Sequence, residues 1–80
     1  MKELVEYVVK SLVDHPEDVS VDEISDRQGA VLELSVAVSD MGRVIGKSGR
    51  VINAIRALLQ VAAAKQGQHV TLELLESDER

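Results

Sequence analysis

Two glycines three residues apart, with basic residues on both sides, are the part of this sequence best suited to chemistry. They stand in the run Gly46-Lys47-Ser48-Gly49, which Arg43 precedes and Arg50 follows. A turn without Cβ atoms lets a sugar-phosphate chain approach the protein backbone. Lys47 adds a positive charge and Ser48 a hydrogen-bond donor, and a helix that begins at the turn favours phosphate at its amino end. The spacing therefore predicts a phosphate-binding turn.

These glycines have two other interpretations. Gly46 and Gly49 can form a tight turn between helices without any ligand. A nucleotide-binding P-loop is the second alternative, because Gly42 begins the run Gly-Arg-Val-Ile-Gly-Lys-Ser. That motif needs four residues between its glycines, whereas this run has three. We therefore expect no ATP or GTP binding.

Charge is distributed unevenly along the chain. Residues 41–67 hold five basic residues and no acidic one, although the formal net charge of the chain is -5. Three basic and ten acidic residues precede this segment, and one basic and four acidic residues follow it. A local positive face on an acidic protein is typical of nucleic-acid contact, whereas chance segregation on a solvated helix is the alternative. Arg56 and Lys65 are expected to be solvated and to steer a ligand rather than bind it.

The composition excludes several classes of protein. Eighty residues, 45% of them hydrophobic and none of them cysteine, allow one domain with one core and no disulfide. Tyr7 is the sole aromatic residue, so the stacking platforms of ribonucleoprotein-motif sheets and OB folds are excluded. His15 and His69 are expected to be surface groups, and no thiol is present to act as nucleophile or zinc ligand. We expect no enzyme activity, cofactor, metal or small-molecule substrate.

Hydrophobic periodicity predicts six elements. Apolar residues at spacings of three and four predict a first helix with one buried stripe, which Pro16 ends. Alternating residues predict strands on both sides of a hairpin turn that contains Gly29, and Asp40 is expected to cap a short helix. Gly67 is the expected end of a long helix in which Ile52, Ile55, Leu59, Ala62 and Ala63 are buried. The expected ranges are helix 4–13, strands 19–25 and 30–38, helices 40–45 and 50–66, and strand 70–74, with Leu4, Leu12, Ala30, Leu32, Leu34, Val36 and Val38 among the core-facing residues.

These elements predict an α+β fold of two layers. A strand, a helical crossover and another strand pair in parallel, whereas the strands of the hairpin pair antiparallel. The sheet should therefore be small, three-stranded and mixed, with all helices on one face. We expect residues 1–76 to form a single domain and residues 77–80 a short tail. No stretch has the length of a membrane span, so a soluble, cytoplasmic protein is expected.

The glycine run and its flanks resemble the signature of the KH domain. In that signature an apolar pair, here Val44 and Ile45, precedes Gly-x-x-Gly, and an isoleucine, here Ile52, follows three residues after the second glycine. The order of elements over residues 2–75 is similar to that of a prokaryotic type II KH domain. Length and acidic flanks make the chain similar to the small bacterial KH proteins of the KhpA family.

This resemblance implies an RNA-binding site that holds about four single-stranded nucleotides. Ile45 and Ile52 would line an apolar floor under the bases, and the alternative for both is a place in the core. Ile55 is assigned mainly to the core. The RNA-binding residues implied are Arg43, Ile45, Gly46, Lys47, Ser48, Gly49, Arg50 and Ile52.

The resemblance also implies partners and a cellular role. Members of the KhpA family pair with themselves or with a Jag-like (KhpB) KH protein, and they are associated with RNA regulation and, in some bacteria, with cell elongation and division. A homodimer or a heterodimer that acts as an RNA chaperone or post-transcriptional regulator is therefore expected. Two alternatives remain: a dimerisation module with secondary RNA binding, and a ribosome-associated factor.

Overall fold

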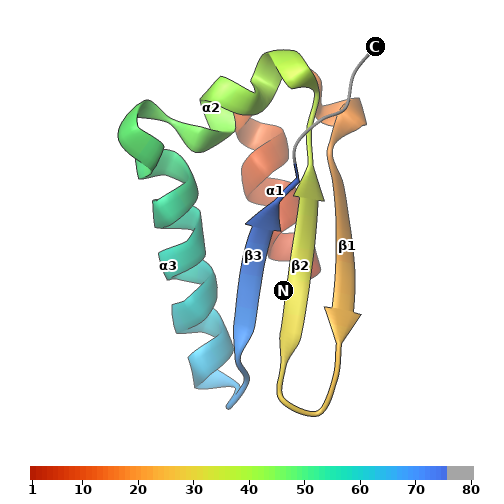
Figure 1. Cartoon of the computed structure of the whole chain (residues 1–80), viewed down its shortest axis with the longest axis vertical. Helices are drawn as coiled ribbons and strands as arrows, with labels where there is room; N and C mark the ends of the chain where they lie inside the picture. Colours follow the sequence, from red (N-terminus) through yellow and green to blue (C-terminus); the bar gives the residue numbers. More distant parts are fainter. Residues whose placement is uncertain (76–80) are drawn as a thin grey trace.

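The chain folds into a sheet of three strands with its helices packed on one side (Figure 1). The structure is a computed structural model that describes residues 1–75, and the predicted tail at residues 77–80 lies outside the described residues. The elements are α1 (Lys2–Leu12), β1 (Ser20–Ser25), β2 (Ala30–Ser35), α2 (Met41–Ile45), α3 (Arg50–Lys65) and β3 (Val70–Leu74), with short 3-10 turns at Pro16–Asp18, Val38–Asp40 and Lys47–Gly49. The predicted α+β order is confirmed. The domain boundary at residue 76 stays a prediction.

The sheet has the mixed pairing that the sequence predicts. β1 and β2 pair antiparallel with Val21 opposite Leu34, and β2 and β3 pair in parallel with Leu32 opposite Leu72. These side chains form one face of the sheet, and the buried residues of α1 and α3 join them in a single apolar cluster. Within residues 1–75, no helix lies on the opposite face (Figure 1). Helices on one face only are therefore confirmed.

The helices contribute fewer core residues than the periodicity predicts. In α1 the buried side chains are Val5 and Val9, whereas Leu4 and Leu12 are exposed, so the prediction that these two leucines belong to the buried stripe is wrong. In α3 the predicted residues Ile52, Ile55, Leu59 and Ala63 are buried, and Ala62 is partly buried. Because a single sheet face covers each helix, the flanks of the apolar stripe stay in solvent.

The predicted end of α3 is confirmed. Gly67 has a φ of +69°, a left-handed conformation that glycine adopts without a Cβ clash. Its amide donates to the carbonyl of Ala64 at 3.0 Å, and the amide of Gln68 donates to the carbonyl of Ala63 at 2.9 Å. These two bonds form a Schellman motif, which satisfies carbonyls that the end of a helix leaves free.

The second strand ends earlier than predicted. β2 stops at Ser35, and Val38 begins a 3-10 turn in which its side chain is exposed, so the expected strand through residue 38 is wrong. The last bond along this side of the sheet runs from the amide of Leu75 to the carbonyl of Leu34 at 2.9 Å. Residues 1–75 offer β2 no further pairing partner beyond this bond, and the chain turns towards α2.

The carboxylate of Asp40 fixes this turn. It is 1% exposed and accepts hydrogen bonds from the backbone amides of Asp14, at 3.1 Å, and His15, at 3.0 Å. Arg43 lies 3.8 Å away and also pairs with the carboxylate of Asp14 at 3.1 Å. No side-chain bond from Asp40 caps α2, so the predicted capping role is wrong. Asp40 instead joins the segment after α1 to the start of α2.

Asp40→Ala should lower the free energy of unfolding by about 2 kcal/mol, because two amides lose a buried charged acceptor. Asp14→Ala removes an exposed partner of Arg43 and should cost less than about 0.5 kcal/mol. Urea unfolding followed by circular dichroism measures both. Equal losses for the two variants would contradict the structural role of Asp40.

Candidate nucleic-acid interface

The run at residues 46–49, called the glycine turn below, reverses the chain between α2 and α3. Gly46 has φ 77° and ψ 172°, a region that is open almost only to glycine. Ser48 (φ 57°) and Gly49 (φ 76°) both adopt the left-handed conformation, and the amide of Gly49 donates to the carbonyl of Gly46 at 3.1 Å. Three of the four residues of the turn thus have positive φ. The turn forms a projecting corner of the molecule between α2 and α3 (Figure 1).

Glycine is needed at positions 46 and 49 for different physical reasons. A Cβ on Gly46 would lie 2.4 Å from Cγ2 and 2.8 Å from the backbone nitrogen of Val51, so this glycine permits the turn to pack against α3. A Cβ on Gly49 would have only Nδ2 of Asn53 nearby, at 3.5 Å, and would otherwise face open space. Gly49 is therefore the glycine that leaves the surface open to a ligand.

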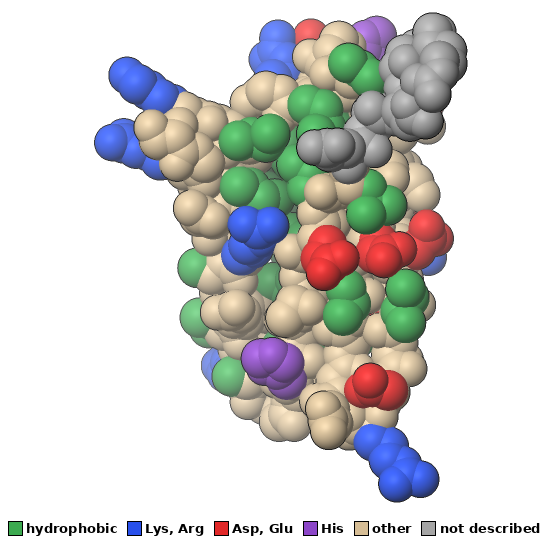
Figure 2. All heavy atoms as spheres, viewed as in Figure 1, with side chains coloured by type: hydrophobic (Ala, Val, Ile, Leu, Met, Phe, Trp, Pro, Cys, Tyr) green, Lys and Arg blue, Asp and Glu red, His purple; other side chains and the backbone are tan. Residues whose placement is uncertain are grey.

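The predicted polar residues of the glycine turn are available to a ligand. Lys47, Ser48 and Arg50 are exposed, and within residues 1–75 neither Lys47 nor Arg50 is paired with a carboxylate. Figure 2 shows basic side chains that project from the corner where α2 meets α3. Gly49 is the N-cap of α3, and no side chain caps this positive end of the helix dipole. The corner can therefore bind a phosphate.

The other predicted site residues differ in whether a ligand can contact them. The guanidinium of Arg43 is engaged with Asp14 and Asp40, on the side of α2 that faces the end of α1. Ile45 is 36% exposed beside the glycine turn and can contact a ligand. Ile52 is 6% exposed and packs in the core, as does Ile55. The structure thus brings together the glycine turn, Arg50 and Ile45, and it holds Arg43 and Ile52 in other contacts.

Arg56 has contacts that the sequence does not reveal. Its Nε donates to the backbone carbonyl of Leu72 at 3.1 Å, and its Nη1 lies 3.4 Å from Oδ1 of Asn53. Leu72 belongs to β3, which is an edge strand. The prediction of a solvated Arg56 is wrong, because a residue 16 positions away holds its guanidinium against the sheet. The one feature of the sequence that singles out Arg56 is its position in the basic segment at residues 41–67, which has no acidic residue.

The open face of the sheet is acidic. Asp22 lies opposite Glu33, and Glu33 lies opposite Glu73, so three carboxylates from three strands share one row. Figure 2 views this face and shows acidic side chains in a row across the sheet. Aligned like charges repel one another and repel a polyanion. Nucleic acid is therefore disfavoured on this face and favoured at the basic corner.

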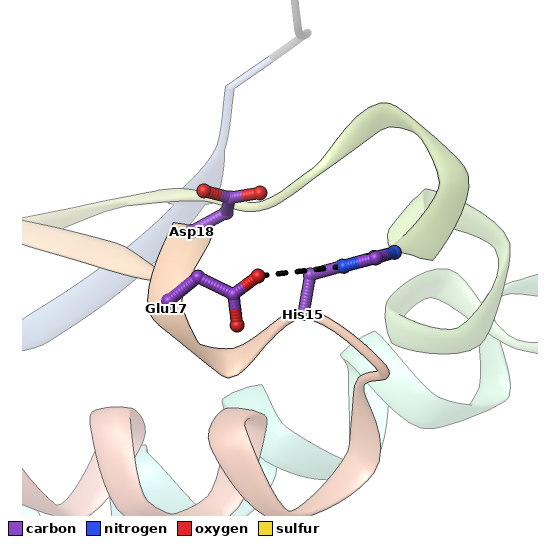
Figure 3. Close-up of side chains that lie close together, drawn as sticks. All are labelled: His15, Glu17 and Asp18. Atoms are coloured by element: carbon purple, nitrogen blue, oxygen red, sulfur yellow. Dashed lines mark ion pairs between the residues drawn. The ribbon is translucent and has the colours of Figure 1, made fainter.

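A second group of polar side chains lies after α1. Nδ1 of His15 is 3.4 Å from a carboxylate oxygen of Glu17, and Asp18 lies next to them (Figure 3). One ligand atom from each lies within 4.8 Å of the others, a spacing that can suit a metal ion. All three side chains are exposed, and a solvated acidic surface also accounts for them.

A two-layer domain with a mixed three-stranded sheet, helices on one face and Gly-x-x-Gly between α2 and α3 has the type II KH architecture. The family model described as "KhpA/KhpB, KH domain" matches residues 2–74. The chain belongs to this KhpA/KhpB family. None of the helices in residues 1–75 combines the length and apolar character that a membrane crossing requires.

Curated relatives cover nearly the whole chain. A protein of Clostridium perfringens named "RNA-binding protein KhpA" is 51% identical over 75 residues, which are 94% of this chain and 100% of the relative. Proteins of the same name from Halalkalibacterium halodurans and Chlamydia pneumoniae are 47% and 46% identical over 76 residues. Those residues are 95% of this chain and 100% and 97% of the two relatives. No solved structure matches the chain significantly.

Gly46→Ala should lower the free energy of unfolding by about 2 kcal/mol or more, because a residue with a Cβ at the φ and ψ of Gly46 costs about 1 to 3 kcal/mol and the contact with Val51 adds to this cost. Gly49→Ala is the matched control, with a similar φ but open space, and should cost only about 1 kcal/mol. Urea unfolding of the two variants measures the difference. A loss as large for Gly49→Ala as for Gly46→Ala would refute the separate roles of the glycines.

Proposed function

We propose that this protein binds single-stranded RNA and holds about four nucleotides at the glycine turn and along the adjoining surface between α3 and β3. The observation that carries the proposal is that Lys47 and Arg50 are exposed at an uncapped helix start and pair with no carboxylate of residues 1–75, on a chain that is acidic elsewhere. Membership of the KhpA/KhpB family and relatives named RNA-binding proteins support the same ligand.

Each residue of the site has a distinct task in this proposal. Phosphates approach the open side of Gly49 and bind Lys47, the Ser48 hydroxyl and Arg50. Ile45 supplies an apolar contact for a base beside the turn. Arg43 acts mainly by holding α2 through Asp14 and Asp40, and Ile52 supports the turn from the core. Neither of these two residues reads the RNA directly.

The cellular role proposed is that of an RNA chaperone or post-transcriptional regulator. A few phosphate contacts without aromatic stacking give modest affinity that weakens as salt rises. Useful binding then requires a second RNA-binding module, because linked modules bind far more tightly than one alone. A second copy of this chain or a KhpB-type KH protein would supply this module, in line with the family to which the chain belongs.

Lys47→Asp combined with Ser48→Asp should reduce RNA affinity by at least about tenfold, because two phosphate-binding groups become repulsive. Fluorescence anisotropy of a labelled, unstructured twelve-nucleotide RNA measures the affinity. For the parent protein, the logarithm of affinity should fall with the logarithm of salt concentration with a slope of about -2 to -3, as for three or four phosphate contacts.

The matched control is Lys65→Asp combined with Gln66→Asp, which changes the net charge equally at the far end of α3. It should retain most of the parent affinity, because these residues lie away from the glycine turn. Circular dichroism verifies that each variant is folded. Equal binding by the two double variants would show that overall charge, and not the glycine turn, determines the affinity.

A second function, self-association through α3, is favoured by an exposed apolar stripe on that helix. Leu58 and Val61 are 62% and 63% exposed, and the exposed residues Ala54 and Ala57 continue the stripe at helical spacing. Beside it lies a shallow apolar groove between α1 and α3, lined by Leu4, Val5, Val8, Ile55, Leu58 and Leu59. The two alanines allow close approach and the two larger residues supply apolar contact area, so the α3 helices of two copies can pack around a two-fold axis.

Leu58→Glu should convert a dimer into a monomer, because packing would bury an unpaired charge. Sedimentation equilibrium over a range of protein concentrations should give twice the chain mass of 8.7 kDa for the parent and that mass for the variant. Gln60→Glu adds the same charge on another face of α3 and should remain dimeric. A parent that stays monomeric at every concentration would refute this interface.

A further inference from the structure

The guanidinium of Arg56 is held in a fixed position between α3 and β3. Its Nε bond to the Leu72 carbonyl, at 3.1 Å, crosses from the helix to the edge strand. The longer contact from Nη1 to Asn53, at 3.4 Å, restrains the plane of the group. The side chain is half-buried, so it has already lost the rotamer freedom that an arginine in solvent keeps.

This fixed group keeps unused hydrogen-bond donors. A guanidinium has five N–H groups in one plane, and the contacts with Leu72 and Asn53 occupy two of them. The remaining three are on the two terminal nitrogens. No acidic side chain of residues 1–75 forms an ion pair with Arg56. The guanidinium of Arg56 therefore presents hydrogen-bond donors in a fixed plane, and no carboxylate of residues 1–75 neutralises its charge.

Arg56 lies on the same side of α3 as the open part of the glycine turn. Nδ2 of Asn53 is the atom closest to the open side of Gly49, and Oδ1 of Asn53 contacts Arg56. Gly49, Asn53 and Arg56 thus follow one another down the helix. Seven residues at 1.5 Å each separate Gly49 from Arg56 by roughly 10 Å, a distance that a bound strand of a few nucleotides spans.

We infer that Arg56 reads a base of the bound strand and favours guanine over adenine at one position; this inference rests on the proposed RNA binding. Phosphates are held at the glycine turn, so the bases of the same strand extend towards β3, where the Arg56 fork lies. The fork matches the two acceptors O6 and N7 of guanine. Adenine offers one acceptor and one donor at the corresponding edge, so one donor of the fork meets no acceptor.

Two labelled uridine dodecamers test this inference, one with three evenly spaced guanines and one with adenines at the same positions. Fluorescence anisotropy at one fixed salt concentration should show the parent protein binding the guanine RNA about tenfold more tightly, a typical effect of one bidentate arginine contact. Arg56→Gln should reduce this ratio to within about twofold. Arg56→Lys keeps the charge but lacks the planar fork, and it should lose the ratio as well.

Lys65→Gln is the matched control, since it removes the same charge from the same helix without a contact to β3. It should keep the tenfold ratio. The ratio compares two RNAs on one protein preparation, so partial unfolding of a variant does not change it. If Arg56→Gln does not fold, Arg56→Lys provides the same test.

A parent protein without preference, or an Arg56→Gln variant that binds both RNAs more weakly by the same factor, overturns base reading while leaving RNA binding intact. A folded parent that binds neither RNA at low salt overturns the proposed function itself.

Discussion

The parallel pairing of β2 and β3 is the constraint on which the rest of the molecule depends. Because Leu32 and Leu72 are neighbours on strands that run the same way, the chain between them has to return along the full length of the sheet. α3 makes this return, and α2 carries the chain from the end of β2 to the start of α3. The glycine turn lies where the path reverses, so the crossover that completes the sheet also forms the projecting corner (Figure 1).

The same crossover separates the charges of the protein. All five basic residues of the segment at 41–67 lie on α2, the glycine turn or α3, whereas the fourteen acidic residues of the chain all lie outside this segment, six of them on α1 and the strands. Strand pairing then aligns Asp22, Glu33 and Glu73 on the face of the sheet opposite the helices. An acidic chain can thus present a positive corner to a polyanion, since repulsion from its other surfaces favours one orientation of approach.

Pairing between distant residues assigns different roles to residues that look alike in the sequence. Arg43, Arg50 and Arg56 are three arginines of one basic segment, yet the first holds α2 to the end of α1, the second is exposed and the third is fixed to β3. The two glycines differ in the same way, because Val51 packs against Gly46 and only Asn53 approaches Gly49. Each difference arises from a contact whose partner the spacing of the motif does not specify.

The sequence by itself determined the order of elements, the mixed sheet, the C-terminal glycine of α3 and the position of the glycine turn. Those features follow from hydrophobic periodicity and from residues with special backbone angles, both of which act over a few neighbouring positions. Only the tertiary structure decided that β2 ends at Ser35, that Asp40 binds the amides after α1 and that Arg56 faces the edge strand. These contacts join residues 16 to 26 positions apart or depend on where a partner strand stops, and no local pattern encodes such distances.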